Sequence, residues 1–345
     1  MTLPKTLRQV FEAQGEACRR LGSPFTGRVC HLLLDVIGEG ALGAQVRDWP
    51  GDPVDDALAL RLCGAFHALA RSGHALAAVY PPAEVSDADL SAALRAAVSA
   101  EEERLIAGIA SAPQTNEVAR SSIILGGLLT VAEETGLPID LLEIGASAGV
   151  NLFPDRFHYV LGEGVSWGDP ASPVSIESRW TGQLPPLDTP LRIGSRAGCD
   201  LAPISAADPA ARDRMLAYIW PDQAARLARA EAALTLAADA GLSVETSGAA
   251  DWLDRRLPEP QGEGRARVLF HTIMWQYMPE AEKARIRATL EAAGAAATAS
   301  HPFAWLRLEP DEARGSAAID LTLWPGGETR RLGRGDFHGR FAEWA

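Results

Sequence analysis

The periodicity of apolar residues changes once along this chain, near Leu137, and the change separates two parts that must fold differently. Before Leu137 the apolar residues recur at intervals of three and four, as from Leu58 to Leu62, which is the spacing of one helix face. After it, short apolar runs of strand length alternate with helical stretches, a pattern typical of a largely parallel sheet covered on both faces. The sequence therefore predicts an all-α cap over residues 1–136 and an α/β domain over residues 137–345.

Start and stop signals place the helices of the first part. Ser23 is an N-cap that precedes a proline at the first helical position, and Ser86 with Asp89 forms a capping box. Glycines follow most of the apolar stretches and mark their ends. We expect helices near residues 7–21, 24–37, 53–72, 87–109 and 115–135.

The second part begins with the apolar run Ile139–Ile144, which predicts a buried strand. A glycine- and proline-rich segment at about 158–190 predicts a β-rich insertion, and Trp324–Gly327 predicts a hairpin turn before a terminal antiparallel strand. Further strands are expected at 242–246, 267–273, 304–308 and 319–323, and helices at 279–293 and at 208–240, the latter broken at Trp220–Pro221.

The charge and hydropathy of the chain indicate which classes of partner it can bind. Of the 345 residues, 32 are Lys or Arg and 45 are Asp or Glu, for a net charge of −13. An acidic chain without a basic cluster repels phosphate backbones, so we expect neither nucleic acid nor a membrane surface as a partner. No segment approaches the ~18 apolar residues of a membrane span, and the N-terminus lacks the apolar core of a signal peptide. These features predict a soluble cytoplasmic protein and leave its oligomeric state open.

The four cysteines have no paired spacing. They are too few and too scattered for a disulfide framework or a zinc site, and small buried hydrophobic roles suit them better. Five histidines also lack paired spacing, and we expect no metal; they are His31, His67, His74, His158 and His301.

The run from Leu141 to Gly149, which reads L-L-E-I-G-A-S-A-G, carries the most chemical information. Glycines directly after a strand let the backbone approach a ligand closely, and a buried acid at the strand end needs a partner. The run resembles motif I of the class I S-adenosylmethionine-dependent methyltransferases, with Ser147 in the place of the middle glycine. The resemblance implies a Rossmann-like three-layer α/β sandwich and S-adenosylmethionine as cofactor. The cofactor-binding residues of this segment are then Glu143, Gly145, Ser147, Gly149 and Asn151.

Two later positions extend the expected cofactor site. The resemblance implies an acid at the end of the second strand that binds the ribose, and Asp200 is the candidate. It lies about fifty residues beyond the glycine turn, where ~20 is usual for the related dinucleotide-binding fold, which requires the β-rich insertion. Asp251 and Trp252 are placed for contact with adenine; the alternative is a helix N-cap and a core residue.

Strand 267–273 supplies the candidate catalytic group. His271 lies near its carboxyl end, where open α/β sheets bind ligands, and is a candidate base or orienting group for the methyl acceptor. Trp275 and Tyr277 follow it and are candidate walls of the acceptor pocket. The alternative for His271 is a buried, hydrogen-bonded core histidine.

A polar cluster precedes the helix that leads into the glycine turn. Gln114, Thr115 and Asn116 either satisfy free amides at a helix start or cover the bound ligands. Arg120 lies four residues after Asn116 and is a candidate partner for an anionic substrate. His338, near the C-terminus, is a further candidate for substrate contact.

The same glycine turn also spells G-x-S-x-G, the nucleophile elbow of α/β-hydrolases. Ser147 would be the nucleophile, with Asp251 and either His271 or His338 in the required chain order. An elbow needs a long helix after the serine, whereas Pro154 follows within two turns. The hydrolase is therefore the second hypothesis, and a catalytically silent, methyltransferase-like binding protein is the third.

The whole chain further resembles an uncharacterised bacterial family known only as a domain of unknown function. The residues that match this family are Gln114–Glu117, Leu142–Gly149 with Asn151–Leu152, Gly198–Asp200, Trp220–Gln223, Asp251–Trp252, Trp324–Gly327 and His338–Gly339. This resemblance implies no activity.

From the glycine turn we expect an S-adenosylmethionine-dependent methyltransferase that acts on a small molecule.

Overall fold

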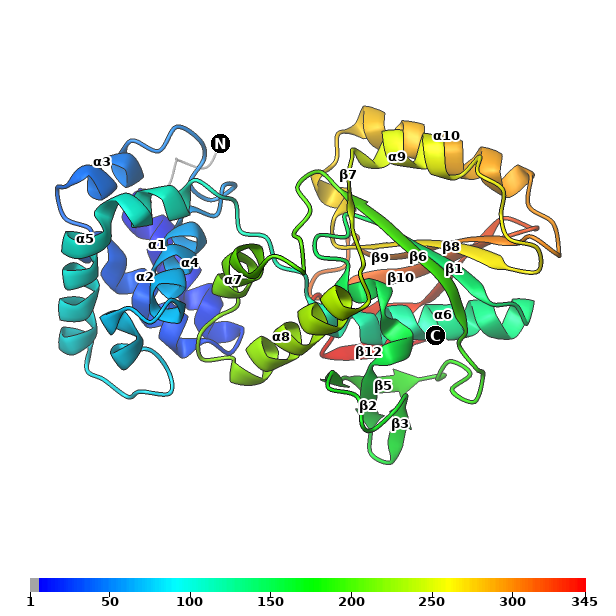
Figure 1. Cartoon of the computed structure of the whole chain (residues 1–345), viewed down its shortest axis with the longest axis horizontal. Helices are drawn as coiled ribbons and strands as arrows, with labels where there is room; N and C mark the ends of the chain where they lie inside the picture. The colour runs from blue at the N-terminus through cyan, green and yellow to red at the C-terminus, as the bar shows by residue number, and fades with distance from the viewer. Residues whose placement is uncertain (1–5) are drawn as a thin grey trace. The chain divides into compact units, whose positions relative to one another are not determined.

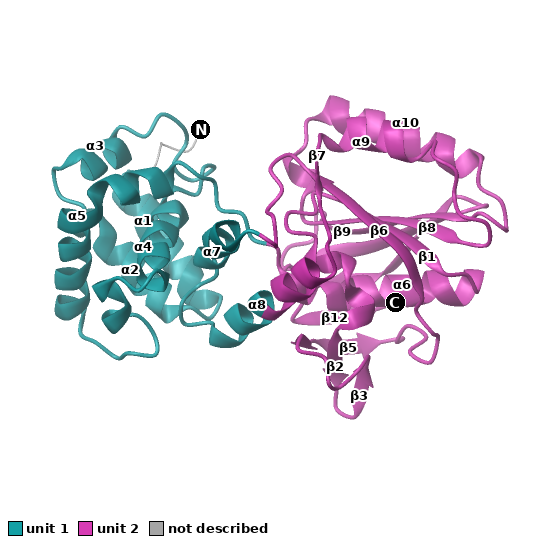
Figure 2. Cartoon of the chain, viewed as in Figure 1, with its two compact units in different colours: residues 1–115, 208–231 teal, residues 116–207, 232–345 magenta. Residues whose placement is uncertain are grey.

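A computed structural model of the protein describes residues 6–345, which form two compact units (Figures 1 and 2). The first unit ends at Thr115 and includes Asp208–Glu231; the second contains Asn116–Ala207 and Ala232–Ala345. The sequence places a single division at residue 136. The helix that ends there belongs instead to the second unit, because its apolar face packs against the sheet.

The first unit is helical, as the periodicity predicts. Its helices are α1 (Leu7–Arg20), α2 (Pro24–Val36), α3 (Ala41–Arg47), α4 (Leu58–Arg71), α5 (Asp87–Ile109), α7 (Pro209–Ala217) and the first half of α8 (Ala224–Asp239). The predicted caps are present: Ser23 accepts from the amide of Thr26, and Ser86 from that of Asp89. One buried apolar cluster, which includes Leu62 and Phe66, joins helices α1 to α5.

Side-chain bonds explain why a distant segment belongs to the first unit. Asp222, in the break between α7 and α8, accepts from the hydroxyl of Ser23 and from the amide of Phe25, 2.8 Å away. The carbonyl of Ala217 lies 2.9 Å from Nδ1 of His67, which is buried on α4. These bonds satisfy polar groups at the start of α2 and inside the core, so the segment packs where its partners are.

The second unit contains a nine-stranded mixed sheet with the order β5-β12-β11-β10-β9-β8-β1-β6-β7. Its strands are β1 (Ile139–Ile144), β5 (Arg179–Gly182), β6 (Ile193–Asp200), β7 (Glu245–Thr246), β8 (Ala266–Thr272), β9 (Phe303–Pro310), β10 (Ala317–Trp324), β11 (Glu328–Gly335) and β12 (Phe341–Trp344). Strands β7, β6, β1, β8 and β9 run parallel to one another. Strands β10 to β12 form antiparallel pairs.

The predicted largely parallel sheet is therefore only half of the observed one. Short connections such as Pro325–Gly327 can join only antiparallel neighbours, and they add a meander to the parallel strands. Burial follows the same division: β1 is almost wholly buried, whereas the first half of β11 is exposed. Central parallel strands are covered on both faces and must be apolar, while an outer antiparallel strand can face water.

Helices cover both faces of this sheet (Figure 1). Helices α9 (Ala249–Arg256) and α10 (Glu280–Ala295) lie on one face, and α6 (Ser121–Thr135) lies on the other. Trp252, Ile286 and Phe303 belong to the apolar cluster beneath α9 and α10. The second unit is thus a mixed α/β structure in three layers.

The β-rich segment expected near residues 158–190 lies between β1 and β6. It contains β2 (His158–Gly162), β3 (Val165–Trp167) and β4 (Ser175–Glu177), which form a small sheet in the order β3-β2-β4. Strand β5 then joins the edge of the large sheet beside β12. The insertion accounts for the long sequence separation between β1 and Asp200.

Among the described residues, no single helix is long and apolar enough to span a membrane; α2 and α3 pass such a test only together, as a pair bent by 107°.

Two glycines of the second unit provide a test of close packing. Gly339 has φ +76°, and a Cβ there would overlap the carbonyl oxygen of Ala119; Gly136 ends α6 with φ +66° and faces open space. We expect Gly136→Ala to cost the ~1–2 kcal/mol of a left-handed backbone. Gly339→Ala should cost a further ~1–3 kcal/mol from overpacking. Urea denaturation measures both, and equal losses would contradict the observed packing.

Candidate functional site

The candidate site lies where the order of the parallel strands reverses. The chain passes from β1 to β6 and β7 on one side and then to β8 and β9 on the other. Ligands of open α/β sheets bind at the carboxyl ends of the strands beside such a reversal. The relevant residues are those that end β1, β6, β8 and β9.

The glycine turn after β1 has an unusual backbone. Gly145, Ser147 and Gly149 have φ values of +68°, +52° and +71°. A Cβ at position 145 would lie 3.0 Å from Cγ of Met274, and one at position 149 would lie 2.5 Å from a methyl group of Leu242. Both glycines are therefore required by conformation and by space. Ser147 carries a side chain in a backbone region that costs energy, which is a feature of functional turns.

Glu143 is a buried carboxyl group at the end of β1. Its side chain is 2% exposed, and Oε2 has no hydrogen-bond partner. Burial raises the pKa of Glu143 well above its ordinary value, the charge of Asp200 raises it further, and Arg120 opposes the rise. A buried carboxyl oxygen without a donor costs free energy, so Glu143 is unfavourable for folding while Oε2 lacks a partner.

Asp200 ends β6 and holds the glycine turn. Its Oδ2 accepts from the amide of Ser147 at 2.9 Å, and its Oδ1 accepts from the amide of Ala202 at the same distance. Each carboxylate oxygen keeps a further lone pair for a ligand. The hydroxyl of Ser147 is buried and has no partner.

Asn151 adds a third incompletely bonded side chain. It is fully buried; its Oδ1 accepts from the hydroxyl of Ser121 at 2.7 Å, and its Nδ2 has no partner. Asn116 is also buried and accepts from the amide of Val150 at 3.2 Å. Unpaired polar atoms at Glu143, Ser147 and Asn151 thus fall within one short segment.

Arg120 connects this segment to the C-terminal loop. Its Nε donates to the carbonyl of Phe337 at 2.8 Å, and its charge acts on Glu143. The amide of the next residue, His338, donates to Asp336. Asn116, Arg120 and the loop of His338 therefore lie near the glycine turn, and their contact with a substrate stays a prediction.

His271 has a different role from the expected free base. It is fully buried, its Nε2 accepts from the indole N–H of Trp305 at 3.1 Å, and its Nδ1 lies 2.7 Å from Oε1 of Glu309. An indole can only donate, so Nδ1 carries the proton and donates it to Glu309. Both ring nitrogens are occupied, and the ring stacks on Trp275 at 5.0 Å.

Glu309 was not among the residues that the sequence indicated. It ends β9 and also accepts from the amides of Met274 and Trp275, at 3.1 and 3.3 Å. These bonds hold the loop after β8, in which Ile273 has φ +51°. An acid at the end of an apolar strand is the signal already used for Glu143, and it could have found Glu309.

Two predicted adenine contacts have other surroundings. Asp251 lies in the first turn of α9 with its side chain 63% exposed and pairs with Arg285 at 2.8 Å. Trp252 is 1% exposed within the core under α9 and α10. The core indole is the alternative that the sequence left open for Trp252. Asp251 instead forms an outward ion pair, and the N-cap that was its alternative role belongs to Gly248.

The remaining predicted residues differ in accessibility. Tyr277 is 78% exposed, and Trp275 is half-buried against His271. Gln114 and Thr115 belong to the first unit, just before the division, so their expected contact with ligands stays a prediction.

The described residues contain no group of three or more His, Cys, Asp or Glu that could hold a metal ion. The four cysteines are buried free thiols. Burial raises the pKa of Cys199 to about 12, and burial also contributes to the raised pKa of Cys18. Because a raised pKa disfavours the thiolate, the Cys199 and Cys18 thiols are poor nucleophiles and poor metal ligands.

The fold defines a mixed α/β protein with a glycine turn of positive φ values after β1, joined to a helical unit. The chain belongs to the family described as "Uncharacterized protein conserved in bacteria (DUF2332)", whose model matches residues 8–344. No curated protein and no solved structure matches the chain. The match over nearly the whole length agrees with the family resemblance of the sequence.

The burial of Glu143 predicts a pH-dependent stability. Below its ordinary pKa of 4.5 the carboxyl is protonated in both states; above it, the unfolded chain ionises first, because the folded pKa is raised. Stability is therefore lost as pH rises towards the folded pKa, by up to ~1.4 kcal/mol per pH unit. We expect Glu143→Gln to gain stability over wild type as the pH rises above 4.5, in urea denaturation. The exposed Glu291→Gln is the control, and parallel curves would contradict the prediction.

The hydrogen bonds that Glu309 accepts predict that its substitution lowers the stability of the protein. Glu309→Gln places an N–H group where His271 or the backbone amides donate, so we expect a loss of ~1.5–3 kcal/mol in the free energy of unfolding. The exposed Glu312→Gln is the matched control. Nitrogen NMR of wild type should report the Nδ1–H tautomer of His271, and an Nε2–H tautomer would refute the network.

Proposed function

We propose that this chain is an S-adenosylmethionine-dependent methyltransferase that acts on a small-molecule acceptor. The observation that carries the proposal is the buried Glu143, with an oxygen that lacks a donor, at the end of β1. It stands beside the reversal of strand order and before a glycine turn with positive φ values.

The topology supports the class. The strand order β7-β6-β1-β8-β9 is the order 3-2-1-4-5 of the Rossmann-like arrangement. In that arrangement β6 is the second strand, so Asp200 lies at the position from which the resemblance implies a ribose contact. The antiparallel strands from β10 to β12 are an addition to this order beside β9.

The side chains fit the proposed cofactor. S-adenosylmethionine, when bound, supplies an electrophilic methyl group and carries positive charge on its sulfonium and amino groups. Glu143 and Asp200 are carboxyl groups that act on each other electrostatically, and a nearby cation would favour their ionised forms. Ser147 and Asn151 offer a hydroxyl and an amide, each with an unpartnered atom. Asp251 and Trp252 are left out of the site.

The acceptor would be held by the loop after β8. Glu309 and His271 fix this loop, and Trp275 stacks on His271. His271 acts as a positioning residue in this proposal, because neither ring nitrogen is available to a substrate. The net charge of −13, without a basic track, favours a small acceptor over nucleic acid.

The hydrolase hypothesis has one observation in its favour. Ser147 has the positive φ of a nucleophile elbow, and the sheet is mixed. An elbow serine needs a base, however, and the hydroxyl of Ser147 has no hydrogen-bond partner. The element that follows is the three-residue 3-10 helix Val150–Leu152 instead of a long helix. Both facts favour the methyltransferase.

Calorimetry with S-adenosylmethionine and S-adenosylhomocysteine tests the proposal. We expect wild type to bind both, and Glu143→Ala to lose at least ~10-fold in affinity, because a buried charged partner is removed. Asp251→Ala should bind as wild type does, since its carboxylate faces Arg285. Absence of heat and of thermal stabilisation with either ligand would refute the cofactor.

A labelling experiment separates the alternatives. Isotopically labelled S-adenosylmethionine should transfer its methyl group to the small-molecule fraction of a bacterial extract, and Trp275→Ala should reduce that transfer. Label found only in protein, DNA or RNA would overturn the choice of acceptor. Binding without transfer would identify a silent binding protein, and a fluorophosphonate adduct on Ser147 would identify a hydrolase.

A further inference from the structure

Two arginines project from the parallel strands on the side of the sheet that α10 covers. Arg267 lies at the amino end of β8, and Arg307 lies towards the carboxyl end of β9. Arg307 is in register with His271, which is four residues after Arg267. Side chains alternate along a strand, so both arginines lie on the same face. They differ in what surrounds their charge.

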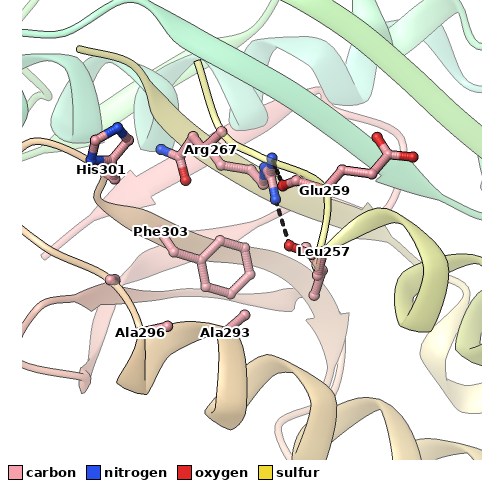
Figure 3. Close-up of a pocket in the computed structure, with 9 residues that line it drawn as sticks. Leu257, Glu259, Arg267, Ala293, Ala296, His301 and Phe303 are labelled. Carbon is pink, nitrogen blue, oxygen red and sulfur yellow. Dashed lines mark hydrogen bonds between the residues drawn. The ribbon is translucent and has the colours of Figure 1, made fainter. Parts of the chain in front are cut away.

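Arg267 has its partners inside the protein. It lines a cavity of about 300 Å³ and donates to the carbonyls of Leu257 and Glu259 at 2.8 and 3.0 Å (Figure 3). Burial lowers the pKa of Arg267, and the carboxylates of Asp140 and Glu259 oppose that effect. A charge with such internal partners does not require an external anion.

Arg307 has far fewer partners. It is half-buried, and its Cζ lies 3.9 Å from the centre of the Trp305 ring. One of its five N–H groups donates to the hydroxyl of Thr322 at 3.2 Å. Its Nε is buried without a partner, and among residues 6–345 its Nη1 accepts no bond partner either. A partly buried guanidinium with so little bonding costs free energy that an acceptor would recover.

A second arginine lies beside it. Arg287, which is exposed on α10, has its Cζ 5.5 Å from the centre of the Trp275 ring. The rings of Trp275 and Trp305 are 5.7 Å apart, so one pair of tryptophans supports both arginines. Within residues 6–345, no carboxylate forms an ion pair with Arg287 or Arg307. The two arginines therefore form a cationic pair without a counter-ion.

The acids nearest to this pair are already engaged. Asp320 on β10 accepts from Nε of Arg331 at 2.6 Å, and Glu309 accepts from the amides of the loop after β8. Burial lowers the pKa of Arg307; Asp320 opposes that effect, and Arg331 and Arg287 lower the pKa further. A bound anion would offset this repulsion between like charges.

We propose that Arg287 and Arg307 bind the anionic group of the methyl acceptor, which is a small carboxylate or phosphate. The inference rests on the proposed function, because Trp275 borders both the acceptor loop and Arg287. A planar guanidinium fork can bind either oxyanion through two parallel hydrogen bonds. The methyl group would be transferred to another part of the same molecule.

Titration of the full chain with phosphate and with acetate tests the site. The indole N–H signal of Trp275 in NMR reports binding in every variant, with chloride at equal ionic strength as the reference. We expect at least one of the two anions to bind at low ionic strength, where exposed charges are least screened. The anion that binds more tightly identifies the group as a phosphate or a carboxylate.

Variants assign the binding to these two residues. Arg307→Gln should weaken it about tenfold and Arg287→Gln, which is exposed, about threefold. Arg307→Lys should be intermediate, since it keeps the charge but loses the fork. Arg20→Gln, exposed on α1, removes the same charge elsewhere and should bind as wild type does. Absence of binding at millimolar phosphate and acetate, or equal binding by all variants, would refute the site.

A separate measurement tests whether the anion belongs to the acceptor. The methyl-labelled product from a bacterial extract should be retained on an anion-exchange resin, and label only in the unretained small molecules would overturn this assignment. Glu143→Ala should bind phosphate or acetate as wild type does, and Arg307→Gln should bind S-adenosylmethionine as wild type does. Failure of the cofactor site and failure of the anion site are therefore distinguishable.

Discussion

The burial of Glu143 is the constraint on which the candidate site depends. Strand β1 pairs in parallel with β6 on one side and β8 on the other, and helices cover both faces. A carboxyl group near the end of such a strand loses its water and finds only part of its bonding inside the protein. The glycine turn lets Met274 and Leu242 approach its backbone closely, because larger residues at 145 and 149 would collide with them.

Carboxylates at the ends of neighbouring strands organise the rest of this edge. Asp200 bonds the amide of Ser147 and so joins the end of β6 to the turn after β1. Glu309 does the same for the loop after β8, through the amides of Met274 and Trp275. Each acid accepts hydrogen bonds from loop amides that have no backbone carbonyl as a partner. A loop held by such charge-assisted hydrogen bonds is preorganised for a ligand. The two loops therefore border the site as ordered walls.

Much of the fold followed from local patterns. The capping signals at Ser23 and Ser86 and the apolar spacing predicted the helices of the first unit to within a few residues, because both are properties of consecutive residues. The run at 139–144 predicted β1 for the same reason. The short α3 was missed, and so was the place of Asp208–Glu231 in the first unit, since the bonds of Asp222 to Ser23 and Phe25 join residues about 200 positions apart.

The sequence by itself determined which residues are buried and where the chain turns: an acid before a glycine turn, a buried histidine, and strands of a given length. Tertiary structure alone decided which groups meet. The sequence left His271 as a base, an orienting group or a hydrogen-bonded core histidine, and its neighbours on β9, Trp305 and Glu309, occupy both ring nitrogens. Asp251 was turned outward by Arg285 on the next helix. Periodicity reports the burial of a side chain, but its hydrogen-bond partners come from strands and helices that become neighbours only after the sheet has paired.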